Sequence, residues 1–174
     1  MNKFYGHLHT INTHRRTVRK LCFKMGLYWQ GLTHDLSKYS PVEFWSGVKY
    51  FQGNRSPIDA EKKALGYSKG WLHHKGRNAH HWQYWADMID GELKVNEMPM
   101  KYIKEQVCDR IAACKTYQKE KYHDSSALEF FYHSRESKLL PPKTYKYIEH
   151  YLKIVAENPL DKAIKMIKED TTTF

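Results

Sequence analysis

Histidine and aspartate residues carry the clearest chemical signal in this sequence. Among its 11 histidines, His14 lies in a stretch with helical spacing of apolar residues, and His34 is followed directly by Asp35. Asp109 lies within the apolar stripe of a predicted helix, where a carboxylate is costly unless it is paired or binds a metal. Imidazoles together with carboxylates suit Fe, Mn, Ni, Co or Zn, and argue against Ca or Mg alone. The alternatives are a satisfied, half-buried histidine at His14 and a buried salt bridge at Asp109.

Two further histidine pairs flank a short polar stretch. His73-His74 precede residues 75–78, and His80-His81 follow them closely. These histidines are either additional metal ligands or solvated imidazoles on a loop. Lys38 lies four residues after His34, so a helix would place the two on one face. The remaining histidines are expected at surface or half-buried positions: His7, His9, His123, His133 and His150.

The elements that must position these residues are predicted to be helical almost throughout. Ser40-Pro41, Pro57 and Pro99 are typical helix starts, and Gly26 is a typical helix end. No run of alternating apolar and polar residues is long enough to predict a sheet. We expect an all-α, single-domain helical bundle over residues 1–174, with a metal-binding core at 7–122 and C-terminal helices at 123–174. The expected helices span residues 7–25, 27–36, 41–51, 57 to before Gly70 or Gly76, 79–89 after an Asn78 cap, 99–122, 124–132, 141 to before Asn158, and the segment after Pro159.

Length and composition exclude several classes of protein. The 174 residues suffice for one domain, and no stretch approaches the roughly 18 apolar residues of a transmembrane helix. The N-terminus lacks the apolar segment of a secretory signal. Three cysteines without a Cys-x-x-Cys pair are expected to be buried apolar residues, and a reducing cytoplasm fits them best. The net charge of +10 is compatible with nucleic acid or phosphorylated partners, and also with a solvated helix surface.

The order of these residues resembles the metal-binding signature of the HD-domain superfamily of metal-dependent phosphohydrolases. His14, His34-Asp35 and Asp109 follow the order His…His-Asp…Asp, and residues 34–38 resemble the His-Asp-x-x-Lys segment of that superfamily. The later histidine pair and residues 107–113 are similar to the HD-GYP branch around its later ligands. The similarity covers about residues 7–116. The Gly-Tyr-Pro of that branch is missing after the histidine pair, which argues against hydrolysis of cyclic-di-GMP.

The resemblance implies an HD-like fold that binds one or two divalent transition-metal ions and hydrolyses a phosphate ester. Asp35 would bridge or anchor the metals, and Lys38 would hold the phosphate or protonate the leaving oxygen. The implied substrate contacts are Lys75, Arg77 and Arg110. The implied metal ligands are His14, His34, Asp35, Asp109 and, for a second ion, His74 with His80 or His81, while His73 stays an alternative.

The expected function is therefore that of a phosphohydrolase acting on a small phosphorylated substrate, with nucleotides as the first candidates. Some HD proteins with a similar six-ligand arrangement hold a mixed-valence di-iron pair and oxidise C–H bonds with dioxygen, which is a second possibility. A third is a basic, nucleic-acid-binding helical protein with a structural metal site, although no helix-turn-helix, RNA-binding or zinc-finger signature is present. No membrane partner is expected.

Overall fold

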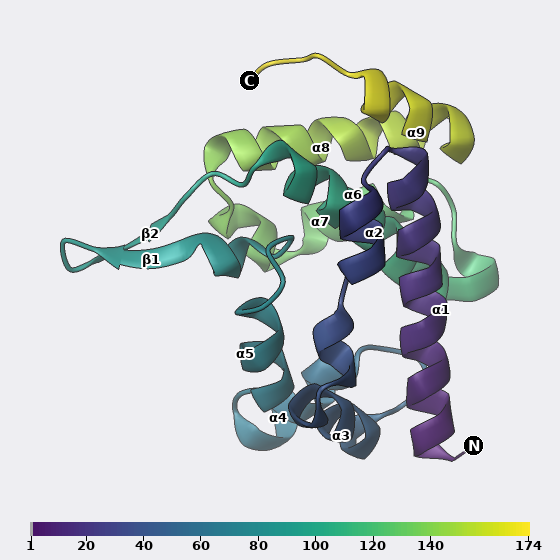
Figure 1. The fold of residues 1–174 in the computed structure, drawn as a ribbon, viewed down its shortest axis with the longest axis vertical. Coiled ribbons are helices and arrows are strands. Elements are labelled where there is room, and N and C mark those ends of the chain that lie inside the picture. Colours follow the sequence, from purple (N-terminus) through teal and green to yellow (C-terminus); the bar gives the residue numbers. More distant parts are fainter. Residues whose placement is uncertain (1) are drawn as a thin grey trace.

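The computed structural model describes residues 2–174, all with their side chains except Glu136. Within these residues the chain forms nine α-helices and one two-stranded sheet, which confirms the expected all-α fold (Figure 1). The helices are α1 (Lys3–Lys24), α2 (Tyr28–Thr33), α3 (Pro41–Tyr50), α4 (Pro57–Leu65), α5 (Lys69–Lys75), α6 (Met100–Gln118), α7 (Ser126–His133), α8 (Pro142–Glu157) and α9 (Leu160–Glu169). The strands are β1 (Ala86–Ile89) and β2 (Glu92–Val95), and short 3₁₀ turns include Leu36–Tyr39 and Trp82–Trp85.

Helices α1 and α6 pack against each other. Other helices pack around them in two groups, one at each end of the molecule. At one end, α8 covers α6, with α7 and α9 packed against α8 (Figure 1). Val18, Val107, Ile111, Ile148 and Leu152 are completely buried in the apolar core there. At the other end, α3, α4 and α5 gather near the start of α1 (Figure 1). The predicted metal ligands come from segments that meet between these two groups.

Local sequence signals set many of the helix ends. The Ser40 side chain accepts a hydrogen bond from the backbone N–H of Glu43, and Pro41 occupies the first turn of α3. Ser68 caps α5 in the same way through the N–H of Trp71. Gly26 follows α1 with a φ of 78°, a left-handed conformation that glycine adopts at little cost. These residues therefore fix where α3 and α5 begin and where α1 ends.

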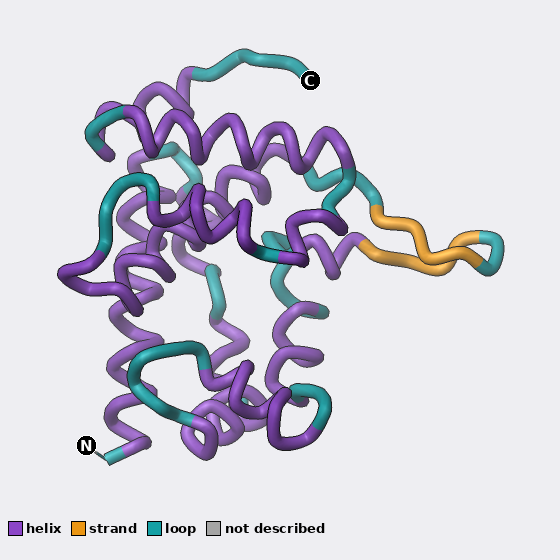
Figure 2. The backbone as a smooth tube through the Cα atoms, turned by 180° about the vertical axis from the view of Figure 1, so that it is seen from behind, coloured by secondary structure: helices purple, strands orange, loops and turns teal. Residues whose placement is uncertain are grey.

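The predictions of two helices were wrong. The segment from Pro57 forms two helices, because Gly66 takes a φ of 79° and ends α4. The helix expected at 79–89 is replaced by a 3₁₀ turn and a hairpin, in which Ala86 pairs with Val95 and Ile89 with Glu92. Positive φ at Asp90 and Gly91 forms the two-residue turn that joins antiparallel strands. Each strand has only four residues, too few for alternation to be recognised, and the hairpin projects from the helices (Figure 2).

The three cysteines are buried and free, as expected. Cys22 and Cys108 lie in the apolar core between α1 and α6. Among the described residues, no helix combines the length and apolar character that crossing a membrane requires.

The buried face of α8 should carry a large share of the stability. Leu152 is completely buried, so Leu152→Ala is expected to lower the free energy of unfolding by about 2–5 kcal/mol through lost contacts and a residual cavity. Leu93 on the hairpin is 67% exposed, and Leu93→Ala should change it by less than about 0.5 kcal/mol. Urea denaturation followed by circular dichroism measures both values. Equal values for the two variants would contradict this description of the core.

Candidate metal centre

Four potential donor side chains from three segments meet in a first cluster, which we call site A: His14, His34, Asp35 and Asp109. His14 projects from α1 and Asp109 from α6, while His34 and Asp35 directly follow α2. The His14 Nε2 atom lies 2.9 Å from Asp109 Oδ1 and 3.4 Å from His34 Nε2. The His34 Nε2 atom lies 3.3 Å from Asp35 Oδ2 and 3.6 Å from Asp109 Oδ1.

A second cluster, site B, contains Asp35, His74, His80 and His81. His74 comes from α5, and His80 and His81 come from the turn before Trp82–Trp85. The His74 Nε2 atom lies 3.2 Å from Asp35 Oδ1 and 3.0 Å from His81 Nε2, and His80 Nε2 lies 3.5 Å from Asp35 Oδ1. Asp35 therefore presents one carboxylate oxygen to each site.

The spacing of these atoms matches that of metal ligands. Nitrogen and oxygen ligands bind transition metals at about 2.0–2.2 Å, so neighbouring donors in octahedral or tetrahedral geometry lie roughly 3.0–3.5 Å apart. The separations in sites A and B run from 2.9 Å, between His14 Nε2 and Asp109 Oδ1, to 3.7 Å, between His14 Nε2 and Asp35 Oδ2. Both buried clusters could therefore hold a metal ion.

The backbone places Asp35 between the two sites. Asp35 has a φ of 54° and a ψ of 26°, the left-handed conformation, at the junction between α2 and the turn Leu36–Tyr39. Aspartate visits this region more readily than most residues, and such conformations cluster at functional sites. The side chain is only 1% exposed. The turn thus introduces a charged group into the interior at the meeting point of α1, α5 and α6.

Two buried glutamates, Glu43 and Glu105, contact the Nδ1 atoms of histidines in sites A and B. One oxygen of Glu105 lies 2.9 Å from Nδ1 of His34 and 3.2 Å from Nδ1 of His80, and Glu43 lies 2.8 Å from Nδ1 of His74. An ionised carboxylate only accepts hydrogen bonds, so each of these Nδ1 atoms carries the proton. The Nε2 atoms of the same three histidines therefore face Asp35, an orientation like that of the carboxylate–histidine pairs behind metal ligands.

This arrangement leaves polar atoms without partners. Asp35 Oδ1 and His80 Nε2 are buried and have no hydrogen-bond partner among residues 2–174. They lie 3.5 Å apart, with a lone pair on one side and a carboxylate oxygen on the other. Such unsatisfied buried groups are costly unless a proton or another cation lies between them. A metal ion would satisfy both atoms.

The electrostatics of the sites attract positive charge. Burial lowers the pKa of His34, but the charge of Asp35 and the hydrogen bonds to Asp35, Asp109 and Glu105 together outweigh burial and hold this pKa well above its ordinary value. Burial raises the pKa of Asp35 and Asp109. The charges of His34, Lys38 and His74 hold the pKa of Asp35 well below the usual range, and the hydrogen bonds and charges of His14 and His34 do the same for Asp109. Burial keeps the pKa of His81 well below its ordinary value. Both aspartates are thus ionised and His81 is neutral, the forms in which these groups bind metals, whereas His34, with its raised pKa, must release a proton to become a ligand.

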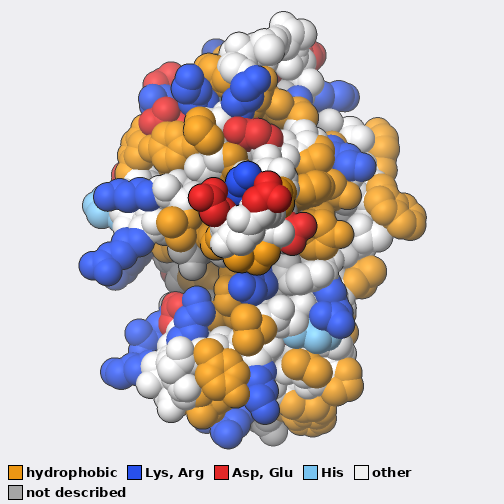
Figure 3. All heavy atoms as spheres, turned by 90° about the vertical axis from the view of Figure 1, so that its left-hand side faces the viewer, with side chains coloured by type: hydrophobic (Ala, Val, Ile, Leu, Met, Phe, Trp, Pro, Cys, Tyr) orange, Lys and Arg blue, Asp and Glu red, His pale blue; other side chains and the backbone are white. Residues whose placement is uncertain are grey.

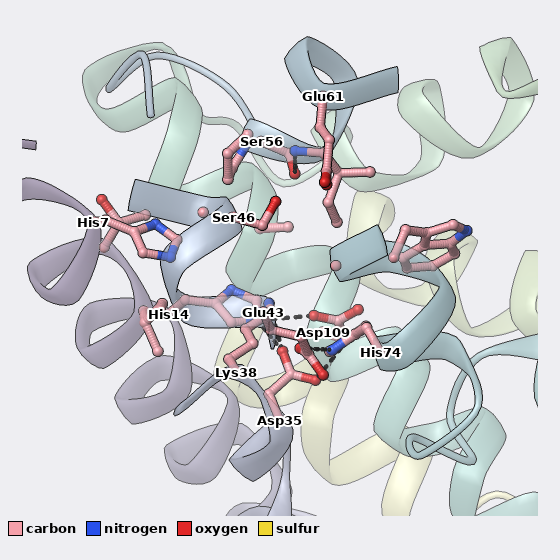
Figure 4. A pocket seen from close by; sticks show the side chains of 18 of the residues that line it. His7, His14, Asp35, Lys38, Glu43, Ser46, Ser56, Glu61, His74 and Asp109 are labelled. Atoms are coloured by element: carbon pink, nitrogen blue, oxygen red, sulfur yellow. Dashed lines mark hydrogen bonds and ion pairs between the residues drawn. The ribbon is translucent and has the colours of Figure 1, made fainter. Parts of the chain in front are cut away.

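A cavity of about 310 Å³ opens onto both sites. Figure 4 shows His14, Asp35, His74 and Asp109 together at one side of it, with Lys38 beside them. The Lys38 Nζ atom lies 2.6 Å from Asp35 Oδ2, and its side chain is 30% exposed. The cavity thus brings an accessible ammonium group next to the carboxylate shared by the two sites.

The structure brings together all seven predicted metal ligands and Lys38. It does not place the predicted substrate contacts Lys75, Arg77 and Arg110 on the described wall of the cavity. Arg77 is exposed and donates to the backbone carbonyl of His73, and Arg110 lies over the ring of Phe131. These three basic residues follow the predicted ligands closely in sequence, but Lys75 and Arg110 lie on other faces of α5 and α6, and Arg77 lies in the turn after α5. Lys38 is the predicted basic residue that does line the cavity.

Several residues of the centre were missed from the sequence. Glu105 lies four residues before Asp109 on α6 and hence on the same face, a signal that could have identified it. Glu43 gives no such signal, since its partners His73 and His74 are on another helix. His7 was expected at the surface or half-buried, but it is buried in the cavity wall, where burial and the charge of Lys38 lower its pKa to about 4.

Comparison with known families adds one finding. Residues 3–154 match the family model described as a family of unknown function, DUF5662. The chain belongs to the DUF5662 family. The match spans every residue of sites A and B. Comparisons with curated proteins and with solved structures found no match.

In this DUF5662 protein, Glu105 should strengthen metal binding without being a ligand. Glu105→Gln replaces an acceptor shared by His34 and His80 with an amide that can donate to Nδ1, which favours the wrong tautomer. We expect metal affinity to fall about 10- to 100-fold with the helical content unchanged. Competition with a chromophoric chelator measures the affinity, and Glu157→Gln on the exposed side of α8 is the matched control. Equal affinities in the two variants would remove this role from Glu105.

Proposed function

We propose that this protein holds two divalent transition-metal ions, one in site A and one in site B, and hydrolyses a small phosphate monoester. The observation that supports this most strongly is the position of Asp35, whose two oxygens serve two donor clusters at the side of one cavity. A mixed set of imidazoles and carboxylates suits Fe, Mn, Ni, Co or Zn. When bound, such ions polarise phosphoryl oxygens and lower the pKa of a bound water to near 7.

Lys38 supplies the positive charge for the substrate. Burial lowers the pKa of Lys38, but the charges of Asp35 and Asp109 with the hydrogen bond to Asp35 raise it above its ordinary value. Its Nζ atom lies 2.6 Å from Asp35 Oδ2 and its side chain lines the cavity, so we assign Lys38 to binding of the phosphate oxygens. This assignment narrows the two roles that the sequence left open.

The size and charge of the cavity favour a small substrate with one phosphate. A volume of about 310 Å³ is near the lower end for ligand pockets. Lys38 is the one Lys or Arg side chain among the described residues that line it, which is little positive charge for a triphosphate. Its far wall carries Ser46, Ser56 and Glu61, groups that can bond the hydroxyls of a sugar (Figure 4). A nucleoside monophosphate or a sugar phosphate therefore fits best.

A di-iron oxygenase is the second candidate, and one observation favours it. The two sites together offer five imidazoles and two carboxylates, a nitrogen-rich set that suits iron as well as other transition metals. Protein loaded with iron would then consume dioxygen in the presence of its substrate and show the EPR signal of a half-oxidised pair. A hydrolase loaded with the same metal would release phosphate without oxygen uptake.

The nucleic-acid alternative has weaker support. On the face shown in Figure 3, Lys and Arg side chains are interspersed with acidic and hydrophobic ones. Nucleic-acid-binding surfaces gather their basic side chains along one face. The buried donor clusters and the cavity beside them are better explained by an enzyme.

Metal content should depend on each site in a different way. Elemental analysis of wild-type protein purified without chelator is expected to give two ions per chain. Asp35→Ala should give none, because both ions lose a shared carboxylate, whereas His14→Ala and His81→Ala should each lose one ion. His9→Ala, an exposed histidine on α1, is the matched control and should keep both. If Asp35→Ala folds and retains two ions, the shared-carboxylate assignment fails.

Phosphatase activity should require Lys38. With added Mn, Ni or Fe, the wild-type protein is expected to release phosphate from nucleoside monophosphates or sugar phosphates. Lys38→Met should lower kcat/KM about 10- to 100-fold, mainly through KM, since a charge-assisted hydrogen bond contributes about 1.5–3 kcal/mol. Lys49→Met, an exposed residue on α3, is the control. If the metal-loaded wild type releases no phosphate from a broad set of phosphoesters, the hydrolase proposal is wrong.

A further inference from the structure

A second cavity, of about 300 Å³, lies on another side of α1 and shares no lining residue with the metal cavity. Its described lining is Asn12, Arg15, Arg16, Arg19, Gly31 and Tyr39. The four α1 residues among these are spaced so that they share one face of the helix, away from the face that carries His14. We call this set of residues the arginine groove.

Arg15 is held rigidly at the inner side of the arginine groove. Its Nε donates to the carbonyl of His34 at 2.8 Å, and its terminal nitrogens donate to the carbonyl of Leu32 at 3.2 Å and to the Tyr39 hydroxyl at 3.1 Å. Tyr39 in turn donates to Asn12 at 2.6 Å, and its ring lies 5.0 Å from the Arg15 guanidinium carbon. A guanidinium has five N–H donors, so these bonds leave Arg15 with free donors in a fixed orientation.

Arg16 and Arg19 have no acidic partner. Among residues 2–174, neither forms an ion pair, and neither donates a side-chain hydrogen bond. Three guanidinium groups therefore surround one hollow without a carboxylate to neutralise them. Like charges at this spacing on a helix are destabilising, and an anion would relieve the repulsion. Arginine is also the residue best suited to planar, bidentate contact with phosphate oxygens.

We propose that the arginine groove is a binding site for a small phosphate-bearing anion, separate from the metal cavity. The charges surround a compact hollow, whereas contact with a nucleic acid backbone requires a basic stripe that follows successive phosphates. The ligand is therefore a free phosphate or a small phosphorylated molecule. The site does not depend on the proposed hydrolase activity.

Isothermal titration of the full-length protein with inorganic phosphate, at constant ionic strength set with chloride, tests this site. Arg16→Gln/Arg19→Gln is expected to weaken one phosphate-binding event at least about tenfold while metal content stays unchanged. Arg55→Gln/Arg135→Gln removes the same charge from exposed positions outside both cavities and should change affinity less than about twofold. Lys38→Met identifies any phosphate bound at the metal cavity, and it should leave the arginine-groove event intact.

Three outcomes would overturn the proposal. Equal weakening in both arginine double variants would show an effect of net charge alone. Unchanged binding in Arg16→Gln/Arg19→Gln, with loss in Lys38→Met, would place all phosphate at the metal cavity. In a parallel titration with a short single-stranded oligonucleotide, weaker oligonucleotide binding but unchanged phosphate binding in Arg16→Gln/Arg19→Gln would assign the surface to nucleic acid.

Discussion

The burial of the Asp35 carboxylate is the constraint on which the rest of the site depends. An ionised carboxylate that is 1% exposed must be compensated by positive charge, or the protein would lose stability. Lys38 supplies one compensating contact, at 2.6 Å from Oδ2. The other oxygen faces the Nε2 atoms of His74 and His80, at 3.2 and 3.5 Å. This oxygen has no hydrogen-bond partner among the described residues, so the clusters around it could hold a cation.

Glu105 is a second carboxylate, besides Asp35, that contacts residues of both site A and site B. A single oxygen of Glu105 contacts His34, which belongs to site A, and His80, which belongs to site B. Since Glu105 is on α6, this one residue links α6 to the end of α2 and to the turn before the hairpin. A change in the orientation of either imidazole would alter the hydrogen bond available to the other. The two donor clusters consequently behave as one centre with a common support.

How far the sequence could predict this protein depends on the kind of signal. Proline and serine at helix starts are local signals, and His14, His34-Asp35 and Asp109 have a recognisable order along the chain. These signals led to the fold class and to the candidate ligands. The hairpin at 86–95 was missed because four-residue strands offer almost no alternation. Glu43 was missed because its contacts with histidines are made across helices. Proximity along the chain also failed for Arg110, which follows Asp109 but lies on a different face of α6 over Phe131.

Residues of helix α1 line both cavities. His34, at the end of α2, is bonded to α1 residues of both cavities. His14 on one face of α1 lies 3.4 Å from the His34 ring, and Arg15, the next residue, donates from the adjacent face to the His34 backbone carbonyl. The same Arg15 satisfies the Leu32 carbonyl, one of the groups that a helix end leaves without an internal partner. His34 is thus held by its ring on the metal side and by its carbonyl on the arginine side. The donors that Arg15 presents to the arginine groove and the donor that holds the His34 carbonyl therefore belong to one planar guanidinium group, so a single side chain orients both the arginine groove and the backbone of a candidate metal ligand.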